Sequence, residues 1–374
     1  MDLLDQFIYN FTHNLFKPIL LFFYLGFLIP ILKVPLEFPP ALYKALTIYL
    51  LIAIGWHGGE ELAELTPDNL SDAVGFMLIG FTSNFIIGIA AYYALRNMTR
   101  LRKIDAATVA GYYGSDSAGT YVTAVGVLVT ANIAYAAYMP VMLAVMEIPG
   151  CLVALYLVSK MRHSGVMDEN GTMPGEPGYD PISGKVKEVK HHGQSQPIFS
   201  KKVLHEIFFN PGLYLLFGGI VIGYVSRLQG VHVTEANDKF FVVLFQGVLC
   251  LFLLEMGMTA CSRLKDLKLG GKGFIAFALI APNVFATFGI MVAHGYSMFL
   301  DQPFEVGTYV LFAVLSGAAS YIAVPAVQRI AIPEASPTLP LAASLGLTFT
   351  YNVTIGIPVY IMLTTAVIQA LPVN

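Results

Sequence analysis

The clearest chemical feature of this sequence is an acid among small polar residues. Asp116 lies in GSDSAG (114–119), between Ser115 and Ser117 and inside a long apolar stretch. A carboxylate buried in a membrane is costly unless a partner offsets its charge, and no basic residue is an obvious partner here. Carboxylates, hydroxyls and free carbonyls are the oxygen ligands that hard cations prefer. We therefore expect Asp116 and Ser117 to bind sodium; a proton-carrying Asp116 is the competing interpretation.

A second tract of small residues, SGAAS (316–320), interrupts a later apolar stretch. Such tracts hold a helix poorly, and a half-helix that starts at a break presents free N–H groups and a partial positive charge to an anion. The alternative is that the small residues allow close helix packing. The residues expected to bind a small anion by hydroxyls or close backbone approach are Ser115, Ser316, Gly317, Ala318, Ala319 and Ser320.

Polar residues also interrupt two neighbouring apolar stretches. We expect Ser83 and Asn84 to contribute to the sodium site and Asn283 to the anion site, although these side chains could instead bond across to the broken helices. Glu147 and Glu255 are expected to form structural pairs or protonated hydrogen bonds. The sequence contains no Ser-His-Asp arrangement, metal-binding cluster or phosphate loop in a plausible context, so we expect neither enzymatic activity nor a cofactor other than the coupling ion.

The elements that must position these residues are membrane helices. Of the 374 residues, 56% are hydrophobic and only 12% are charged, with a mean hydropathy of +0.68; a soluble domain carries roughly 25% charged residues. The net charge of −3 argues against a nucleic-acid partner. Apolar stretches long enough to cross a bilayer lie near 14–32, 38–57, 72–96, 104–130, 134–159, 204–226, 238–261, 273–297, 304–330 and 338–370.

These ten stretches form two sets of five with similar sequences. LIAIG (51–55) matches LLEMG (253–257), GFMLIGF (75–81) matches AFALIAP (276–282), and the two small-residue tracts match in the same order. Because five is odd, the second copy must be inverted in the membrane. We therefore expect an all-α membrane protein with a 5+5 inverted repeat, in which the two broken helices cross at mid-membrane. The repeats would span 1–159 and 204–374, joined by a flexible loop at 160–203.

The distribution of positive charge predicts the orientation. If the N-terminus is outside, all but three of the 21 Lys and Arg residues (Lys17, Arg227 and Lys239) lie on the cytoplasmic side, including those of the 160–203 loop. Both termini would then be external. In repeats of this kind a bundle carries the broken helices and moves against a scaffold. Here the third to fifth and eighth to tenth spans would form the bundle, and the other four spans the scaffold.

GYYGSDSAGTYVTA (111–124), LSGAASYIAVPAV (315–327) and the long loop after the fifth span resemble the cyanobacterial family of sodium-dependent bicarbonate transporters. The resemblance covers the whole chain. It implies bicarbonate uptake in symport with sodium, in inorganic carbon accumulation, by a homotrimer in the cytoplasmic (inner) membrane. It also implies a cytoplasmic regulator, a PII-like, adenine-nucleotide-binding protein (SbtB). Symport suits an anion, because one sodium cancels the charge that must enter a negative cell.

Two other functions remain open at this point. A cation/proton antiporter would bind proton and sodium alternately at Asp116, although such exchangers commonly use two mid-membrane acids and GSDSAG offers one. A symporter for an organic anion would be favoured by Arg or aromatic side chains around a large cavity, whereas the breaks offer mainly small residues. A channel fits least, because paired and unlike breaks suit alternating access.

Overall fold

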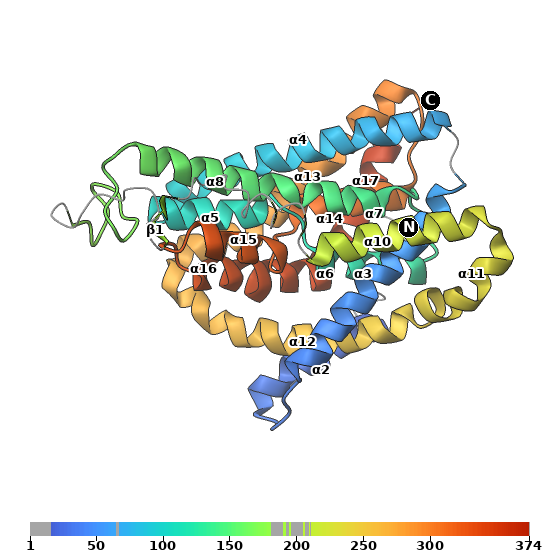
Figure 1. The fold of residues 1–374 in the computed structure, drawn as a ribbon, viewed down its shortest axis with the longest axis horizontal. Coiled ribbons are helices and arrows are strands. Elements are labelled where there is room, and N and C mark those ends of the chain that lie inside the picture. Colours follow the sequence, from blue (N-terminus) through green and yellow to red (C-terminus); the bar gives the residue numbers. More distant parts are fainter. Residues whose placement is uncertain are drawn as a thin grey trace.

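The computed structural model describes residues 16–64, 67–180, 190–191, 194–195, 205, 209 and 211–373, and these are almost entirely helical (Figure 1). Residues 1–15 and most of residues 181–210 lie outside the described residues, and with them the later part of the loop expected at 160–203. The helices of the first half are α2 (Pro18–Leu32), α3 (Pro40–Leu62), α4 (Pro67–Met98), α5 (Lys103–Tyr113), α6 (Ala118–Thr130), α7 (Met139–Met146) and α8 (Ile148–His163). Two short strands, β1 (Lys190–His191) and β2 (Gln194–Ser195), form an antiparallel ladder.

The second half contains helices of three kinds. The α-helices are α10 (Pro211–Leu228), α11 (Val231–Asp238), α12 (Phe245–Arg263), α13 (Gly271–Leu300), α14 (Val306–Gly317), α15 (Ala323–Ala331), α16 (Thr338–Leu341) and α17 (Ile357–Ala370). The segments η1 (Lys239–Val243), η3 (Ala342–Phe349) and η4 (Asn352–Gly356) are π-helical, and η2 (Leu264–Gly270) is a 3₁₀-helix. Proline stands at the first helical positions of α2, α3, α7 and α17, where its missing N–H group costs nothing.

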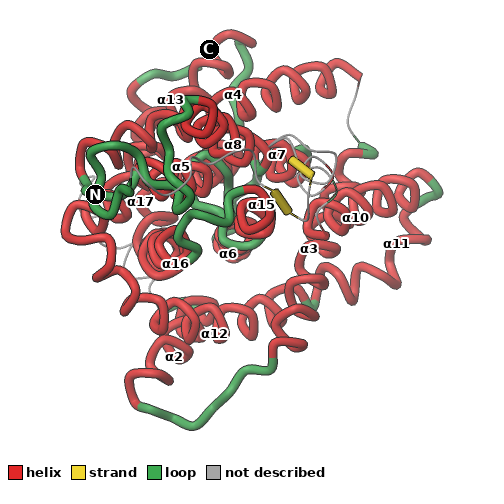
Figure 2. Tube along the Cα trace, turned by 60° about the vertical axis from the view of Figure 1, so that its left-hand side comes forward, coloured by secondary structure: helices red, strands yellow, loops and turns green. Residues whose placement is uncertain are grey.

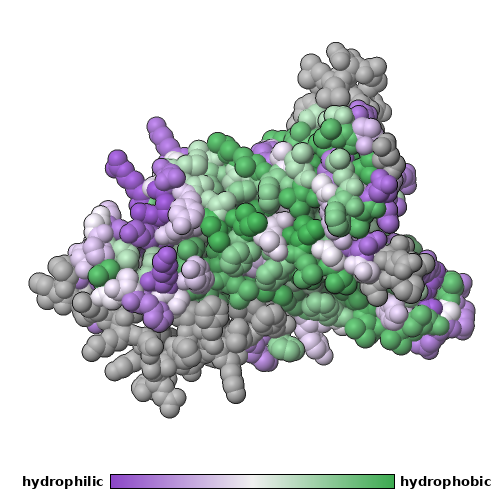
Figure 3. Space-filling view, turned by 90° about the horizontal axis from the view of Figure 1, so that it is seen from above, coloured by the Kyte–Doolittle hydropathy of each residue, from purple (hydrophilic) through white to green (hydrophobic). Residues whose placement is uncertain are grey.

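Apolar length and composition mark this chain as a membrane protein. Among the described residues, six helical stretches are long and apolar enough to cross a membrane, and two shorter apolar helices, α2 and α14, accompany them. Figure 3 shows a broad band of hydrophobic side chains between two more hydrophilic ends. We call one of these the basic end: α5 begins there, α8 and α15 end there, and it carries Arg96, Arg102, Arg162 and Arg329.

Two helix pairs pack so closely that only glycine fits between them. A Cβ atom at Gly26 of α2 would lie 1.9 Å from the Leu254 carbonyl oxygen of α12, and one at Gly257 of α12 would lie 2.2 Å from the Phe23 carbonyl oxygen. In the same way, Gly55 of α3 contacts the backbone of Gly219 in α10. Figure 2 shows α2 beside α12 and α3 beside α10.

The remaining helices form a bundle around the two interrupted segments. α4 packs on α5 and α8, α13 packs on α14 and α17, and α6 contacts α14 (Figure 1). The interrupted helices are almost completely enclosed: every residue from Ile104 to Tyr113 and from Gly307 to Gly317 is buried. A buried position of this kind keeps main-chain groups at the breaks away from lipid, as irregular backbone in a membrane requires.

The first part of the loop expected to be flexible has a fixed fold at the basic end. Asp168 accepts hydrogen bonds from the backbone N–H groups of Asn170 and Thr172, at 3.0 and 2.7 Å, and Asp168, Thr172 and Met167 are buried. Burial alone would raise the pKa of Asp168, but these N–H groups hold it below its ordinary value. The Gly and Pro residues of this segment lie in turns, where Gly171, Gly175 and Gly178 have positive φ.

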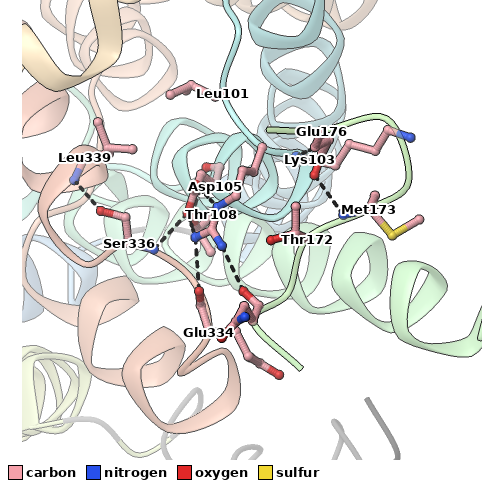
Figure 4. Close-up of polar contacts among 12 residues, drawn as sticks. Leu101, Lys103, Asp105, Thr108, Thr172, Met173, Glu176, Glu334, Ser336 and Leu339 are labelled. Atoms are coloured by element: carbon pink, nitrogen blue, oxygen red, sulfur yellow. Dashed lines mark hydrogen bonds and ion pairs between the residues drawn. The ribbon is translucent and has the colours of Figure 1, made fainter. Parts of the chain in front are cut away.

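A network of charged side chains connects this segment to both interrupted helices (Figure 4). Arg102, just before α5, binds Asp105 at 2.7 Å and the carbonyl oxygens of Asn170 and Glu334 at 2.8 and 3.1 Å. Arg162 of α8 pairs with Glu334, which follows α15, at 2.7 Å. The beginning of α5, the end of α8 and the end of α15 are therefore held together.

Candidate functional site

Both small-residue tracts interrupt a helix, as the sequence predicts. α5 ends at Tyr113 and α6 begins at Ala118, while α14 ends at Gly317 and α15 begins at Ala323. The two breaks contact each other through the main chain, because the Ser320 N–H group donates to the Tyr112 carbonyl oxygen at 2.9 Å. The breaks therefore form one site, to which each half of the chain contributes a helix C-terminus and a helix N-terminus.

Asp116 is completely buried in the first break, and among the described residues neither of its carboxylate oxygens has a hydrogen-bond partner. The break is held by close backbone packing: a Cβ atom at Gly114 would lie 2.7 Å from the Gly88 Cα and 3.1 Å from both the Gly150 Cα and the Asn84 carbonyl oxygen. A buried, unpaired carboxylate is strongly unfavourable. Its surroundings therefore leave it available to a cation or a proton.

The hydroxyl groups on either side of Asp116 have different hydrogen-bond roles. Ser115 donates its hydroxyl proton to the Glu147 carbonyl oxygen at 2.6 Å, which leaves its oxygen as an acceptor. Ser117 is the N-cap of α6: its oxygen accepts from the Thr120 N–H group at 3.3 Å and from the Thr120 hydroxyl at 2.9 Å. The Ser117 hydroxyl can therefore donate its own proton at the start of α6, where the Tyr321 hydroxyl lies within interaction range.

The polar residues of α4 and α13 differ in their relation to the breaks. Asn84 is fully buried; its Nδ2 donates to the Met146 carbonyl oxygen at 2.9 Å and to that of Leu315 at 3.5 Å, while its Oδ1 has no partner among the described residues. Ser83, next to it, is buried as well. Asn283 of α13 instead donates to the Leu279 carbonyl oxygen of its own helix at 3.2 Å and accepts from the Tyr351 hydroxyl at 2.6 Å.

The second break is extended backbone surrounded by small groups. Ala318 leaves the helix with φ −89° and ψ 177°, and Ala318, Ala319 and Ser320 are all buried. Gly317 lies against α13, where a Cβ atom would be 2.6 Å from the Pro282 carbonyl oxygen. The Ser316 hydroxyl is buried without a partner among the described residues, whereas the Ser320 hydroxyl accepts from the Val324 N–H group at 3.5 Å.

Two residues of this site escape the sequence-based prediction. Asn352 begins the π-helical turn η4, and its Nδ2 donates to the Gly317 carbonyl oxygen at 3.0 Å while its Oδ1 accepts from the Tyr360 hydroxyl at 2.6 Å. Isolated π turns are frequent at functional sites, and a lone Asn in the apolar 338–370 stretch was a usable signal. Glu147, expected to be structural, lies close enough to Asp116 to interact with it electrostatically.

Comparison with known proteins places this site in a transporter family. The model of the Na+-dependent bicarbonate transporter superfamily matches residues 18–365, a range that contains both breaks and every described helix up to α17. No curated protein matches the chain. The family match confirms the resemblance stated from the sequence motifs, and together with the apolar helices it indicates a membrane protein of a sodium-dependent bicarbonate transporter family.

Proposed function

Because this chain belongs to the Na+-dependent bicarbonate transporter superfamily, we propose that it carries bicarbonate and sodium together through the site between its two broken helices. The observation that carries this proposal is the juxtaposition of a buried acid with two helix N-termini. Asp116 offers two unpaired carboxylate oxygens, and the contact between Ser320 and Tyr112 brings the second break next to the first. A cation and an anion bound side by side would each lower the cost of burying the other.

Sodium would bind on the α4 side of the first break. Asp116 supplies charge, Asn84 supplies a free Oδ1 atom, and Ser115 supplies a hydroxyl oxygen whose proton is already donated. Ser83, which is buried beside Asn84, is a further candidate ligand. Ser115 was expected at the anion and Ser117 at the sodium ion; their hydrogen bonds favour the reverse assignment, since a cation needs acceptors and an anion needs donors.

Bicarbonate would bind at the starts of α6 and α15. Ser117 and Ser316 offer hydroxyl donors, and Gly317, Ala318 and Ala319 carry no side chain large enough to prevent an anion from approaching the backbone N–H groups. Ser320 adds a hydroxyl beside the first turn of α15. Asn283 is left out of this site because its side chain forms hydrogen bonds with Leu279 and Tyr351 instead.

We also propose the ten-span, inverted-repeat architecture. The ten apolar stretches coincide with α2, α3, α4, α5–α6, α7–α8, α10, η1–α12, α13, α14–α15 and α16–α17. An inverted repeat accounts for the two tight helix pairs, since aligning LIAIG with LLEMG places Gly55 opposite Gly257, and each of these glycines packs on the first helix of the other repeat: Gly55 on α10 and Gly257 on α2. In this proposal α2, α3, α10 and α12 are the scaffold, the other spans move as an elevator, and the basic end faces the cytoplasm. The homotrimer, the inner membrane and the PII-like regulator SbtB belong to the same proposal.

Labelled bicarbonate uptake into proteoliposomes tests this function. An inward sodium gradient should accelerate uptake at least about tenfold over an equal potassium gradient, because transport requires occupation of the cation site. Equal uptake with sodium and potassium would contradict symport. Labelled formate and nitrate should be tested as competitors.

Exchange of sodium for protons is a second candidate, because the proximity of Glu147 to Asp116 provides the two acids that such exchangers commonly use. It predicts sodium-driven proton movement in the absence of bicarbonate, measurable with a pH-sensitive dye inside the vesicles. A proton flux that appears only when bicarbonate is present would instead reflect bicarbonate entry.

A further inference from the structure

A pocket of about 170 Å³ opens at the basic end, apart from the breaks themselves. It lies between α5 and α15, lined on one side by Thr108 and Tyr112 and on the other by Pro325, Gln328 and Arg329. The connection between α15 and α16, including Ser336, completes the wall. A volume of this size holds a small ion with a few waters and is too small for a nucleotide.

The inner wall of this pocket reaches both broken helices next to their breaks. Tyr112 lies two residues before Gly114, and its carbonyl oxygen accepts from the Ser320 N–H group. Pro325, on the opposite wall, is in the first turn of α15. An ion leaving the central site toward the basic end would therefore meet this pocket within about one helical turn.

The pocket walls are held by hydrogen bonds that do not involve its positive charge. Gln328 donates to the Thr108 carbonyl oxygen at 3.0 Å. The Ser336 N–H group donates to Asp105 at 2.8 Å (Figure 4). These contacts connect α15 and the following turn to α5. These two wall contacts do not involve Arg329, so they hold α15 and the following turn against α5 whether or not the arginine binds a ligand.

Arg329 supplies the charge of this pocket. Its side chain is exposed, interacts electrostatically with Tyr112, and has no hydrogen bond or ion pair among the described residues. The acids nearby in the network are already neutralised, Asp105 by Arg102 and Glu334 by Arg162. A guanidinium group in a small pocket, with its acidic neighbours paired, attracts an oxyanion.

We propose that this pocket is a second binding site for a small oxyanion, in which Arg329 holds the anion between the central site and the solution at the basic end. If the proposed function is correct, on which this assignment of the ligand rests, the anion is the transported bicarbonate. Inorganic phosphate has the same chemistry and is the alternative source of the ligand.

Thermal unfolding of the purified full-length protein tests this site without transport. In sodium-free choline buffer at constant ionic strength, bicarbonate should raise the Tm of the wild type, while chloride should not. Arg329→Gln should raise the half-effective bicarbonate concentration about tenfold or more, because a charged hydrogen bond is lost. Arg329→Lys should retain part of the effect. Arg100→Gln removes an exposed arginine outside the pocket and should match the wild type.

Each outcome decides one part of the proposal. If bicarbonate raises the Tm of Arg329→Gln as effectively as that of the wild type, or if Arg100→Gln loses the effect equally, the site is overturned. If Arg329→Gln has a lower Tm but the same dependence on bicarbonate, Arg329 only stabilises the end of α15. Protection by phosphate but not bicarbonate would overturn the assignment to the transported anion. In proteoliposomes, Arg329→Gln should lower the maximal rate and leave the KM for bicarbonate within about twofold. If the wild type shows no sodium-driven uptake but Arg329-dependent protection remains, the proposed function fails and the anion site stands.

Discussion

At the scale of single residues, hydrogen-bond acceptors and donors lie on different sides of the site, the acceptors where sodium is proposed to bind and the donors where bicarbonate is proposed to bind. Asp116 and Asn84 expose oxygen atoms without partners, and Ser115 has already donated its proton, so this side of the first break can only accept. Ser117 has the opposite character, because its oxygen already accepts two hydrogen bonds. The Ser115 hydroxyl therefore suits a cation, and the Ser117 hydroxyl, two residues further along the sequence, suits an anion.

Asp116→Asn removes the charge at almost constant volume and should abolish sodium-dependent uptake. The apparent sodium affinity should fall at least about tenfold, because a contact to a charged ligand is worth about 1.5–3 kcal/mol. Uptake against sodium concentration measures this, and without sodium the detergent-solubilised variant should keep or raise its Tm, since no described hydrogen bond is lost and a buried charge is removed. Asp301→Asn is the matched control, because Asp301 is exposed and has a φ of 53° that Asn also tolerates. Unchanged sodium dependence in Asp116→Asn would refute its role as a ligand.

At the scale of elements, the second break is a stretch of extended backbone kept open by small side chains. The Gly317 carbonyl oxygen accepts from Asn352, the Ser320 N–H group donates to the Tyr112 carbonyl oxygen, and Ala318 has extended dihedral angles. The break therefore combines a position fixed by other helices with small side chains at 317–319. This combination requires both the small residues within the break and the π turn opposite it.

Ala318→Leu should raise the KM for bicarbonate about tenfold or more, because the larger side chain blocks the approach to the break. Overpacking alone would cost about 1–3 kcal/mol of stability, so the control must carry the same cost. Ala343→Leu supplies it: Ala343 is equally buried in η3, outside either break. Uptake kinetics and Tm should be compared for both. If the two variants change Tm and KM alike, the small residues at 317–319 serve packing alone.

The sequence predicts the helices and their interruptions better than it predicts the tertiary contacts around them. Apolar length and the Gly, Ser and Ala tracts predict the helices and both interruptions, since these depend on local composition. The contact of Glu147 with the site depends on how α7 and α8 pack against the first break, and nothing local encodes it. The fold of 164–180 escaped for the opposite reason: its Gly and Pro residues are typical of both flexible loops and tight turns, and only the contacts of Asp168 and Glu176 decide between them.

At the scale of the whole molecule, two kinds of helix contact coexist. The glycine-mediated pairs α2–α12 and α3–α10 bring backbones together, whereas α6 meets α12 through side chains such as Leu249 and Gln246 against Gly126. An apolar cavity of about 300 Å³ lies at this second interface, between α3, α6 and η1. The tight pairs suit a stationary scaffold, and the looser interface suits a surface along which a bundle moves.

A cross-link across the looser interface should therefore stop uptake, while one within the scaffold should not. Gly126→Cys with Leu249→Cys joins α6 to α12, and Tyr49→Cys with Phe240→Cys joins α3 to η1, where the two rings lie 5.1 Å apart. Both pairs belong in a background without Cys151, Cys250 and Cys261. Uptake is measured before and after a short bis-maleimide reagent, with completion verified by mass spectrometry. Equal activity of both fully cross-linked proteins would contradict this division.

The hydrogen bond from Ser320 to Tyr112 connects two peptide groups, which determines how it responds to mutation. Neither partner is a side chain, so replacing Tyr112 or Ser320 with alanine leaves both hydrogen-bonding groups in place. Alanine scanning would therefore not delete this bond, which is one of several contacts between the two halves of the chain. The bond is preserved by the small residues that let the two backbones approach each other. Both positions could therefore change during evolution while the hydrogen bond remains.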